Sequence, residues 1–556
     1  QAWLNNNTTV DTPEADYDNM MKRGLLATML HVDGVNGGVI AGFHNGAYPY
    51  VWPRDAVYAA ITLARTGHLS EAEAVYAWMK NTTFRDFEGW GRKGFWKQKY
   101  STDGYVIWGA PQIDETAVFP WGVWFQYQMT GDTMMLNNYI EQVRDSVESM
   151  TRTSTVDPSR LQYTAFNLMY SNNVWEDSYD TFIYSNANVW RGLEDARKIF
   201  DAVGSPAEAF NAFTKPNLTK NGLDARLDWN GENTDISQLG ITYPFGVYNP
   251  TDARVNKVAD RINGVATDTF GNNHPLINFS GEHQDTINRY WGDNYWNGGP
   301  WFLSTLWYGL HYAERADYTA GKGDIDNLKY RIDLMLDRVG PAGLGAEQIA
   351  YSNSYLYPGQ GDFRLQTAWP NAWESMSTFV DSVMAFLDYT PDASSNTMRF
   401  KPKLPSAWST MTFNNITLRV VPANLSHKVD VLVEENPGAN TYTHTFTNRT
   451  GNTLYLETTV RVPANSTVYS VTRNGTPVVY SYNAALGAVT TTVPANTGPS
   501  AQTIVQVRLG CPPDFNNDGF IDFTDFDAFV SAFEAGELAS DYNNDGFIDF
   551  TDFDAF

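Results

Sequence analysis

The helical pattern of this chain is clearest in residues 47–84, which read AYPYVWPRDAVYAAITLARTGHLSEAEAVYAWMKNTTF. Small apolar residues recur at helical spacing on one face, at Ala56, Ala59, Ala60 and Leu63. Gly67 is expected to end this first helix. Ser70 and Glu73 have the spacing of a capping box, so a second helix is expected at Glu71–Lys80. The stretch therefore predicts two antiparallel helices joined by a short turn.

The same pattern recurs along the first four hundred residues. Further helices are predicted at Asp16–Leu30, Val118–Met129, Met135–Thr151, Val189–Val203, Trp301–Ala316, Leu328–Val339 and Trp373–Leu387. Long loops rich in Trp, Tyr, Gly and Asn separate these helices, whereas a helical bundle would use short connections. The pattern therefore indicates a mainly α toroid of helical hairpins, which we assign to residues 1–396.

A second region, rich in strands, follows the helices. Phe400–Leu509 contains β-branched and alternating runs such as TLRVV, KVDVLV and LYLETTVRV. An Asn474-Gly475 pair between two runs is typical of a hairpin turn. These features predict a β-sandwich domain at residues 397–510. It carries no catalytic constellation, and we interpret it as a structural appendage.

The composition excludes several classes of partner. The 556 residues carry a formal charge of −25, which disfavours nucleic acids and anionic membrane surfaces. No apolar run is long enough for membrane insertion. The single Cys511 excludes an internal disulfide, and the start at Gln1 is expected for a mature or trimmed product. The 18 Trp residues fit a carbohydrate site, where aromatic faces stack on sugar rings, although most large aromatics serve as core.

The last 46 residues contain an internal repeat. The sequence DFNNDGFIDFTDFDAF at residues 514–529 recurs at 541–556 with one difference, Phe515 against Tyr542. In each copy, oxygen ligands fall on positions 1, 3, 5, 7, 9 and 12 of a calcium loop, and Gly falls on position 6. The predicted Ca²⁺ ligands are Asp514, Asn516, Asp518, Phe520, Asp522 and Asp525, then Asp541, Asn543, Asp545, Phe547, Asp549 and Asp552.

Two carboxylates are the strongest candidates for chemistry. Glu176 lies in NNVWEDSYD (172–180), directly after Trp175 and before a second acid, Asp177. An aromatic wall raises the pKa of a carboxyl group, which suits a general acid. Glu347, in GLGAEQIA (343–350), is the second candidate. Two carboxylates that meet across a pocket are the minimal machinery of glycoside hydrolysis.

The repeat at the C-terminus resembles a type I dockerin, in which two calcium loops are each followed by one helix. Asp at position 12 and the absence of a clear helix before Pro512 fit this resemblance. It implies a dockerin-like module at residues 511–556 that binds Ca²⁺ and a cohesin-type protein. The chain ends within the second expected helix, which would then be truncated.

The helical region resembles glycoside hydrolase family 15, the glucoamylase and glucodextranase family, over roughly residues 15–390. Four blocks carry the resemblance in order: AYPYVWPRDA (47–56), the block from 172 to 196, RYWGDNYWNGGPWFLSTLW (289–307), and GLGAEQ (343–348) followed by LQTAWPNAWE (365–374). The family implies an (α/α)6 barrel, in agreement with the helical hairpins. WGAPQIDETA (108–117) departs from the Gly-Arg-Pro-Gln-Arg-Asp-Gly segment of fungal glucoamylases, which leaves the linkage preference open.

The resemblance also implies roles for single residues. Glu176 resembles the general acid, with Trp175 as its wall, and Glu347 the general base. The positions that resemble substrate-binding residues are Tyr48, Trp52, Arg54, Asp55, Asp177, Arg289, Asp293 and Trp301. Each has a structural alternative, such as an ion pair at a helix start for Arg54 and Asp55, or core packing for Trp301.

The function expected from the resemblance is an exo-acting, inverting hydrolase that releases β-glucose from the non-reducing ends of α-glucans. No cofactor is expected for the chemistry itself. Trehalase, another α-glucosidase or phosphorylase on the same fold, and a catalytically inactive glycan-binding component remain alternatives. With a docking module, the protein is expected to be a secreted or cell-surface bacterial enzyme.

Overall fold

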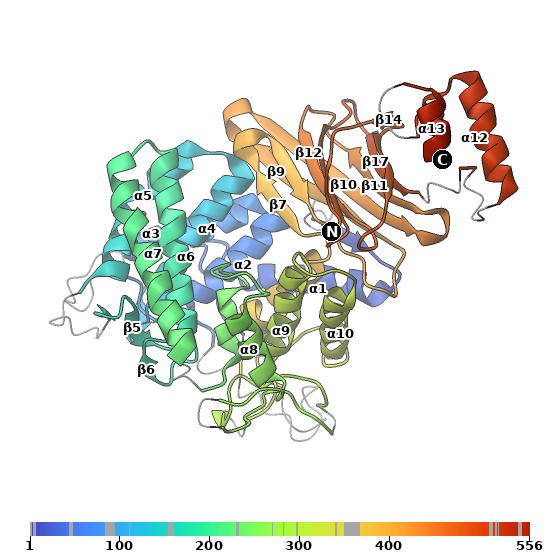
Figure 1. The fold of residues 1–556 in the computed structure, drawn as a ribbon. Helices are drawn as coiled ribbons and strands as arrows, with labels where there is room; N and C mark the ends of the chain where they lie inside the picture. Colours follow the sequence, from blue (N-terminus) through green and yellow to red (C-terminus); the bar gives the residue numbers. More distant parts are fainter. Residues whose placement is uncertain are drawn as a thin grey trace.

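The computed structural model describes residues 3, 7–43, 48–83, 95–110, 112–153, 161–229, 233–268, 271–281, 283–295, 298–339, 342–349, 367–510, 515–516, 520, 522–542 and 547–556. Helices fill the first part of the chain, two sheets follow, and a small helical unit lies at the C-terminus (Figure 1). Among the described residues, no helix combines the length and apolar character needed to cross a membrane.

The helices pair in sequence order, as the hairpin pattern predicts. The pairs are α2 (Pro53–Arg65) with α3 (Leu69–Thr83), α4 (Asp114–Thr130) with α5 (Thr133–Thr151), α6 (Ile183–Ala202) with α7 (Pro206–Trp229), η2 (Ile236–Ile241) with α8 (Ala253–Ile262), and α9 (Phe302–Arg315) with α10 (Gly323–Leu336). A π-helix, η5 (Ala372–Ser377), continues into α11 (Thr378–Met384) and packs against α1 (Ala15–Leu30).

One member of each pair belongs to a closed ring. Within the described residues, α2 packs against α4, α4 against α6, α6 against η2, η2 against α9, and α9 against η5 and α11. The ring closes where η5 packs back against α2. Every residue of α2 from Pro53 to Ala64 is buried, whereas α5 buries one face only. The ring helices therefore form the core, and their partners lie outside them.

Close approach within the ring requires a small residue at one position. A Cβ on Gly122 of α4 would come within 2.6 Å of the Tyr76 ring and 2.8 Å of Val57. Because packed interiors leave no such space, glycine lets α4 lie against α2 and α3.

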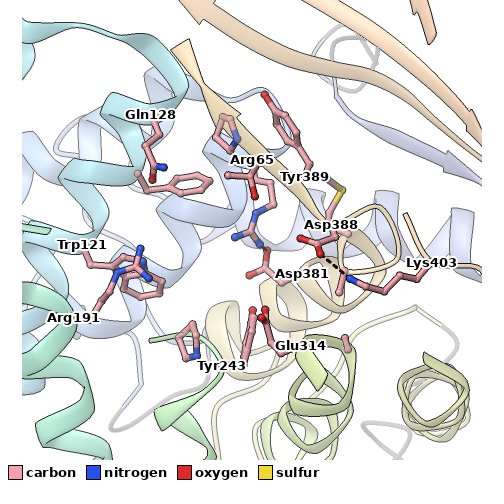
Figure 2. Close-up of a pocket in the computed structure, with 17 residues that line it drawn as sticks. Arg65, Trp121, Gln128, Arg191, Tyr243, Glu314, Asp381, Asp388, Tyr389 and Lys403 are labelled. Atoms are coloured by element: carbon pink, nitrogen blue, oxygen red, sulfur yellow. Dashed lines mark hydrogen bonds and ion pairs between the residues drawn. The ribbon is translucent and has the colours of Figure 1, made fainter. Parts of the chain in front are cut away.

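The ring elements share one direction. The starts of α2, α4 and α9 lie at the end that carries the candidate acids. Their other ends line a cavity of about 260 Å³, into which Arg65 from the end of α2, Gln128 of α4 and Glu314 of α9 project (Figure 2). At this end Lys403 donates to Asp388 over 2.7 Å. Neither Glu176 nor Glu347 lines this cavity.

One sequence prediction for the helices needs correction, and two helices were missed. Helix α3 begins at Leu69, so Ser70 lies inside it, and its hydroxyl donates to Glu71 instead of capping the helix. Helices α7 and α8 were not predicted. Pro216 lies inside α7, and this helix breaker hides the periodicity of the segment.

The strand-rich region forms two sheets. One has the order β1 (Thr9–Asp11), β9 (Thr410–Val420), β10 (Leu425–Asn436), β11 (Thr441–Asn448), β17 (Ala501–Leu509), β13 (Val468–Arg473) and β14 (Thr476–Pro477). The other has the order β15 (Ser481–Asn483), β16 (Ala488–Pro494), β12 (Tyr455–Arg461), β8 (Thr397–Phe400) and β7 (Tyr389–Asp392). The predicted turn at Asn474-Gly475 joins β13 to β14, and both residues have positive φ.

The N-terminal strand β1 was not expected in this region. It pairs antiparallel with β9, and Thr9 lies opposite Asn414. The first residues of the chain therefore complete a sheet made otherwise from its last third. The predicted domain boundary near residue 396 stays a prediction.

The C-terminal unit consists of α12 (Phe523–Ala535), η9 (Leu538–Ser540) and α13 (Phe550–Ala555). Both α12 and α13 begin with a capping box, formed by Asp522 with Asp525 and by Asp549 with Asp552. Each repeat thus contains one helix, as the resemblance to a dockerin implies.

Candidate active site

Glu176 lies on a tight turn between β5 (Met169–Asn172) and β6 (Tyr179–Asp180). The turn is closed by the Asn173 amide, which donates to the Ser178 carbonyl over 2.9 Å, and by the Glu176 amide, which donates to the Asn173 carbonyl over 3.1 Å. Glu176 itself has a φ of +71°. A non-glycine residue in this left-handed region is uncommon, and such strain concentrates at functional sites.

The Glu176 carboxyl group has two donors close by. Trp52 Nε1 donates to its Oε1 over 2.5 Å, and Arg54 Nη2 lies 3.7 Å from the same oxygen. Burial raises the pKa of Glu176, while Arg54 and the Trp52 hydrogen bond oppose this effect. Its side chain keeps 28% of its surface exposed, so a ligand can reach it. These properties suit a proton donor.

Trp175 packs on the other side of the turn. Its indole Nε1 donates to Asp235 over 2.8 Å, and its ring lies beneath the guanidinium of Arg289 at 5.1 Å. Trp52 is therefore the aromatic residue that hydrogen-bonds the candidate acid Glu176. Trp175 instead contacts Arg289. Burial raises the pKa of Asp235 to about 6.

Arg54 is the centre of a buried cluster of carboxyl groups. Its side chain lies 3.2 Å from Asp55, 3.2 Å from Asp114 and 3.4 Å from Glu115. Its backbone amide donates to Glu115 over 2.6 Å. Burial raises the pKa values of Asp114 and Glu115, and raises that of Asp55 to about 7. One guanidinium therefore offsets several buried acids.

Arg289 and Asp293 form a two-pronged ion pair. Arg289 Nε donates to Asp293 Oδ2 over 2.8 Å, and Nη2 donates to Oδ1 over 2.7 Å. The guanidinium also lies 4.2 Å from the Trp301 ring centre, and Trp301 is buried. This arrangement holds the guanidinium in fixed geometry against aromatic faces. Asp177 accepts from the Tyr290 hydroxyl over 2.7 Å at the edge of the cluster.

Glu347 is held where two distant segments meet. Its amide donates to the Ala368 carbonyl over 3.0 Å, and its carbonyl accepts from the Phe302 amide over 3.3 Å at the start of α9. Burial raises the pKa of Glu347 to about 7, and the positive charge of Arg289 opposes this effect. Tyr48 hydrogen-bonds Tyr295 and interacts electrostatically with Glu347.

The sequence candidates for catalysis and substrate binding thus lie in one connected cluster. Trp52 contacts Glu176 and stacks with Tyr48, whose neighbour is Glu347. Asp55 interacts electrostatically with both Glu176 and Glu347, and Arg54 lies 3.7 Å from Glu176.

Several residues of this cluster were missed from the sequence. They are Lys99, Asp114, Glu115, Asp235, Tyr295 and Glu374. Asp114 and Glu115 occupy the first turn of α4, where acids commonly favour a helix start. Their sequence signal therefore resembles ordinary helix capping. Lys99, from the short strand β2 (Lys99–Tyr100), lies 4.8 Å above Trp52, and burial lowers its pKa.

The candidate calcium ligands are only partly described. Asp514, Asp518, Asn543 and Asp545 lie outside the described residues. Asp525 accepts from the Asn516 amide over 3.0 Å and from the Asp522 amide over 2.9 Å, and both Asp525 and Asp552 are buried. Phe520 and Phe547 expose their side chains, and Asp541 is half-buried. The described residues include no group of three His, Cys, Asp or Glu arranged for a metal ion.

Part of the chain matches a known family. Residues 15–263 match the family model described as glycosyl hydrolases family 15. An uncharacterized glycosyl hydrolase of Methanocaldococcus jannaschii is 24% identical over 303 residues, which cover 52% of this chain and 44% of that relative.

Solved structures share the fold at low identity. A wild-type glycosidase superposes with a TM-score of 0.52 and 16% identity, over 67% of this chain and 98% of that one. An alpha-L-rhamnosidase from Dictyoglumus thermophilum superposes with a TM-score of 0.55 and 11% identity, over 90% of this chain and 50% of that one. Residues 15–263 therefore resemble glycosyl hydrolases of family 15, and the solved structures show that the fold is shared.

Proposed function

We propose that this protein is a glycoside hydrolase, and that it is an exo-acting, inverting enzyme that releases β-glucose from the non-reducing ends of α-glucans. The ring of paired helices would then be an (α/α)6 barrel with its active site at the starts of the ring elements. The observation that carries this proposal is the single cluster that joins Glu176 to Glu347 through Trp52, Tyr48, Arg54 and Asp55.

The roles follow from the surroundings of each acid. Glu176 is partly exposed and has a raised pKa, so it would protonate the glycosidic oxygen. Glu347 faces the positive charge of Arg289, which favours its anionic form and suits a base that activates water. Inversion requires the two carboxyl groups to stand about 6.5–9.5 Å apart with water between them.

The sugar itself would be held by two guanidinium groups. Arg54 with Asp55 and Arg289 with Asp293 offer donors and acceptors in fixed geometry to neighbouring hydroxyl groups. Trp52, Trp175 and Trp301 supply aromatic surface around them. A glycosidase variant with a similar fold was solved in complex with glucose.

Product analysis tests the proposal. Maltose, isomaltose, trehalose and soluble starch are incubated with the protein, and the first product is followed by proton NMR. Glucose that appears first as the β-anomer supports an inverting α-glucosidase, and its preference among the four substrates separates a glucoamylase from a trehalase. An α-anomer would overturn inversion, and a requirement for phosphate would indicate a phosphorylase.

A matched pair of variants assigns the acid. Glu176→Gln removes the proton donor and should abolish turnover while largely sparing substrate binding. Glu194→Gln, on the exterior of α6 where Glu194 pairs with Arg197, should keep full activity. Normal turnover by Glu176→Gln would reject this role.

We also propose that residues 511–556 are a dockerin-like module that binds Ca²⁺ and a cohesin-type protein, on a secreted or cell-surface enzyme. The buried Asp525 carboxylate accepts from the Asn516 amide and the buried Asp552 carboxylate from the Asp549 amide, and the remaining ligands predicted there are oxygen atoms, as Ca²⁺ prefers. The ion would order these loops and would take no part in hydrolysis. Calorimetric titration of the chain with Ca²⁺ should reveal two sites.

A further inference from the structure

Glu374 lies beside the candidate base in a way that the sequence does not reveal. It belongs to the first turn of the π-helix η5, and the Asn371 side chain accepts its backbone N–H over 2.5 Å. The side chain is buried, with 6% of the residue exposed. Single-turn π-helices are rare and occur frequently at functional sites.

Three hydrogen bonds hold η5 and the residues just before it against the segment that carries Glu347. The Asn371 amide donates to the Gly345 carbonyl over 3.2 Å, and the Ser375 hydroxyl donates to the same carbonyl over 2.9 Å. The Glu347 amide donates to the Ala368 carbonyl over 3.0 Å. These hydrogen bonds therefore bring η5, and with it Glu374, next to the segment of Glu347.

The two carboxyl groups share a hydrogen bond. A bond between two carboxyl groups requires a proton on one of them, because a carboxylate only accepts. In addition, Glu374 Oε2 is buried without a hydrogen-bond partner among the described residues. A buried oxygen with no donor is costly in an ionised group and much less so in a protonated one.

The surroundings decide which partner keeps the proton. Glu347 faces Arg289, and its Oε2 accepts from the Ala368 amide over 3.4 Å, so its anion is stabilised. Glu374 faces the negative groups Glu347 and Asp55, with Arg54 as the opposing cation. Burial and these two acids raise the pKa of Glu374 well above its ordinary range.

We propose that Glu374 is a positioning residue that stays protonated and donates its hydrogen bond to Glu347, which keeps the base ionised and aimed at the attacking water. This inference rests on the proposed role of Glu347 as the general base. Glu374 would not touch the substrate. It would act only through Glu347, as the neutral partner of a carboxyl pair that shares one proton.

Two substitutions of Glu374 test whether it acts as a hydrogen-bond donor or as an ionised group. Glu374→Gln keeps a hydrogen-bond donor and cannot ionise, so kcat should stay within about threefold of the wild type. Glu374→Leu removes the donor, so kcat should fall about 10- to 100-fold, the equivalent of one hydrogen bond to a charged group. In Glu374→Leu, the fall of kcat/KM at low pH, its acid limb, should also begin at a higher pH, because Glu347 then ionises less readily.

Controls keep the outcome interpretable. Glu314→Gln removes a carboxyl group from the cavity at the opposite end of the ring and should change neither kcat nor the acid limb. Infrared spectra of the intact protein at pH 7 should show the carbonyl band of a buried protonated carboxyl group that disappears in Glu374→Gln. This readout needs neither turnover nor the Leu variant.

The results distinguish this inference from the proposed function. If the wild type releases no sugar from any α-glucoside, the proposed function fails, while the infrared band still reports the shared proton. Three results would each overturn the inference. Glu374→Gln could be as inactive as Glu374→Leu, the acid limb of Glu374→Leu could stay unshifted, or the infrared band could be the same in the wild type and in Glu374→Gln.

Discussion

The hydrogen bond from Trp52 to Glu176 gives a prediction that the structure allows to be worked through. Trp52→Phe keeps an aromatic ring in place and removes only the indole donor, which lies 2.5 Å from Glu176 Oε1. The donor stabilises the ionised carboxylate, as does Arg54 at 3.7 Å. Because the proposed proton donor becomes a carboxylate in the transition state, the Trp52 donor should assist proton transfer.

The size of the expected loss in kcat follows from the type of hydrogen bond that is removed. A hydrogen bond to a charged group contributes about 1.5–3 kcal/mol. The Glu176 side chain is 28% exposed, so water can replace part of the lost interaction, and we expect a loss near the lower limit. About 1.4 kcal/mol corresponds to a tenfold effect on a rate or on an ionisation constant.

The direction in which the pH profile shifts identifies the role of the Trp52 donor. Without the donor, Glu176 holds its proton more tightly, so the alkaline limb of kcat/KM should move to higher pH. At the same time kcat should fall about tenfold, because the carboxylate formed in the transition state is less stable. Trp78→Phe, which removes an indole bond to the Thr102 carbonyl away from the site, should change neither.

The assay is a pH profile of glucose release measured for the wild type and both variants. A lower kcat with an unmoved alkaline limb would show that Trp52 contributes only packing. A limb that moves to lower pH would refute the reasoning, because it would mean that the indole stabilises the protonated acid.

Four further predictions follow from other contacts. Lys99→Met removes a cation near Glu176 and should move the same limb upward by less than Trp52→Phe does, as a pH profile would show. In the wild type, kcat/KM should fall as the pH drops through about 7, since the base must be ionised and burial raises the pKa of Glu347 to about 7; a flat profile there would contradict this. Gly122→Ala should destabilise the fold by about 1–3 kcal/mol through its clash with Tyr76, measured as a lower midpoint in urea. A calcium chelator should unfold residues 511–556, seen by circular dichroism, and leave hydrolysis unchanged, because the loops lie outside the helical ring.

The helices of the ring were predictable because their neighbours bury them. Ala56, Ala59, Ala60 and Leu63 mark α2 clearly, since small apolar residues are required where it packs against α4 and η5. Helices α7 and α8 lie outside the ring, where polar residues and Pro216 weaken the pattern. The pairing of β1 with β9 leaves no local signal, because its partner lies about four hundred residues away.

In the candidate site, too, some residues could be predicted from the sequence and others could not. Glu176 and Glu347 stand in distinctive motifs and could be named from the sequence. Asp114, Glu115 and Glu374 could not, because each belongs to a helical turn whose local sequence has an ordinary structural explanation. Their roles arise only when distant elements meet around Arg54 and Glu347.

The strand β1 has a consequence for how the molecule is made. Thr9 pairs with Asn414, and nearby Glu14 accepts a hydrogen bond from Trp408 over 3.0 Å. During synthesis these partners leave the ribosome some four hundred residues apart, and pairings between such distant residues form slowly. The beginning of the chain must therefore wait for its last third. Removing the sheets to obtain a smaller catalyst would leave β1 as an unpaired edge, a template for aggregation.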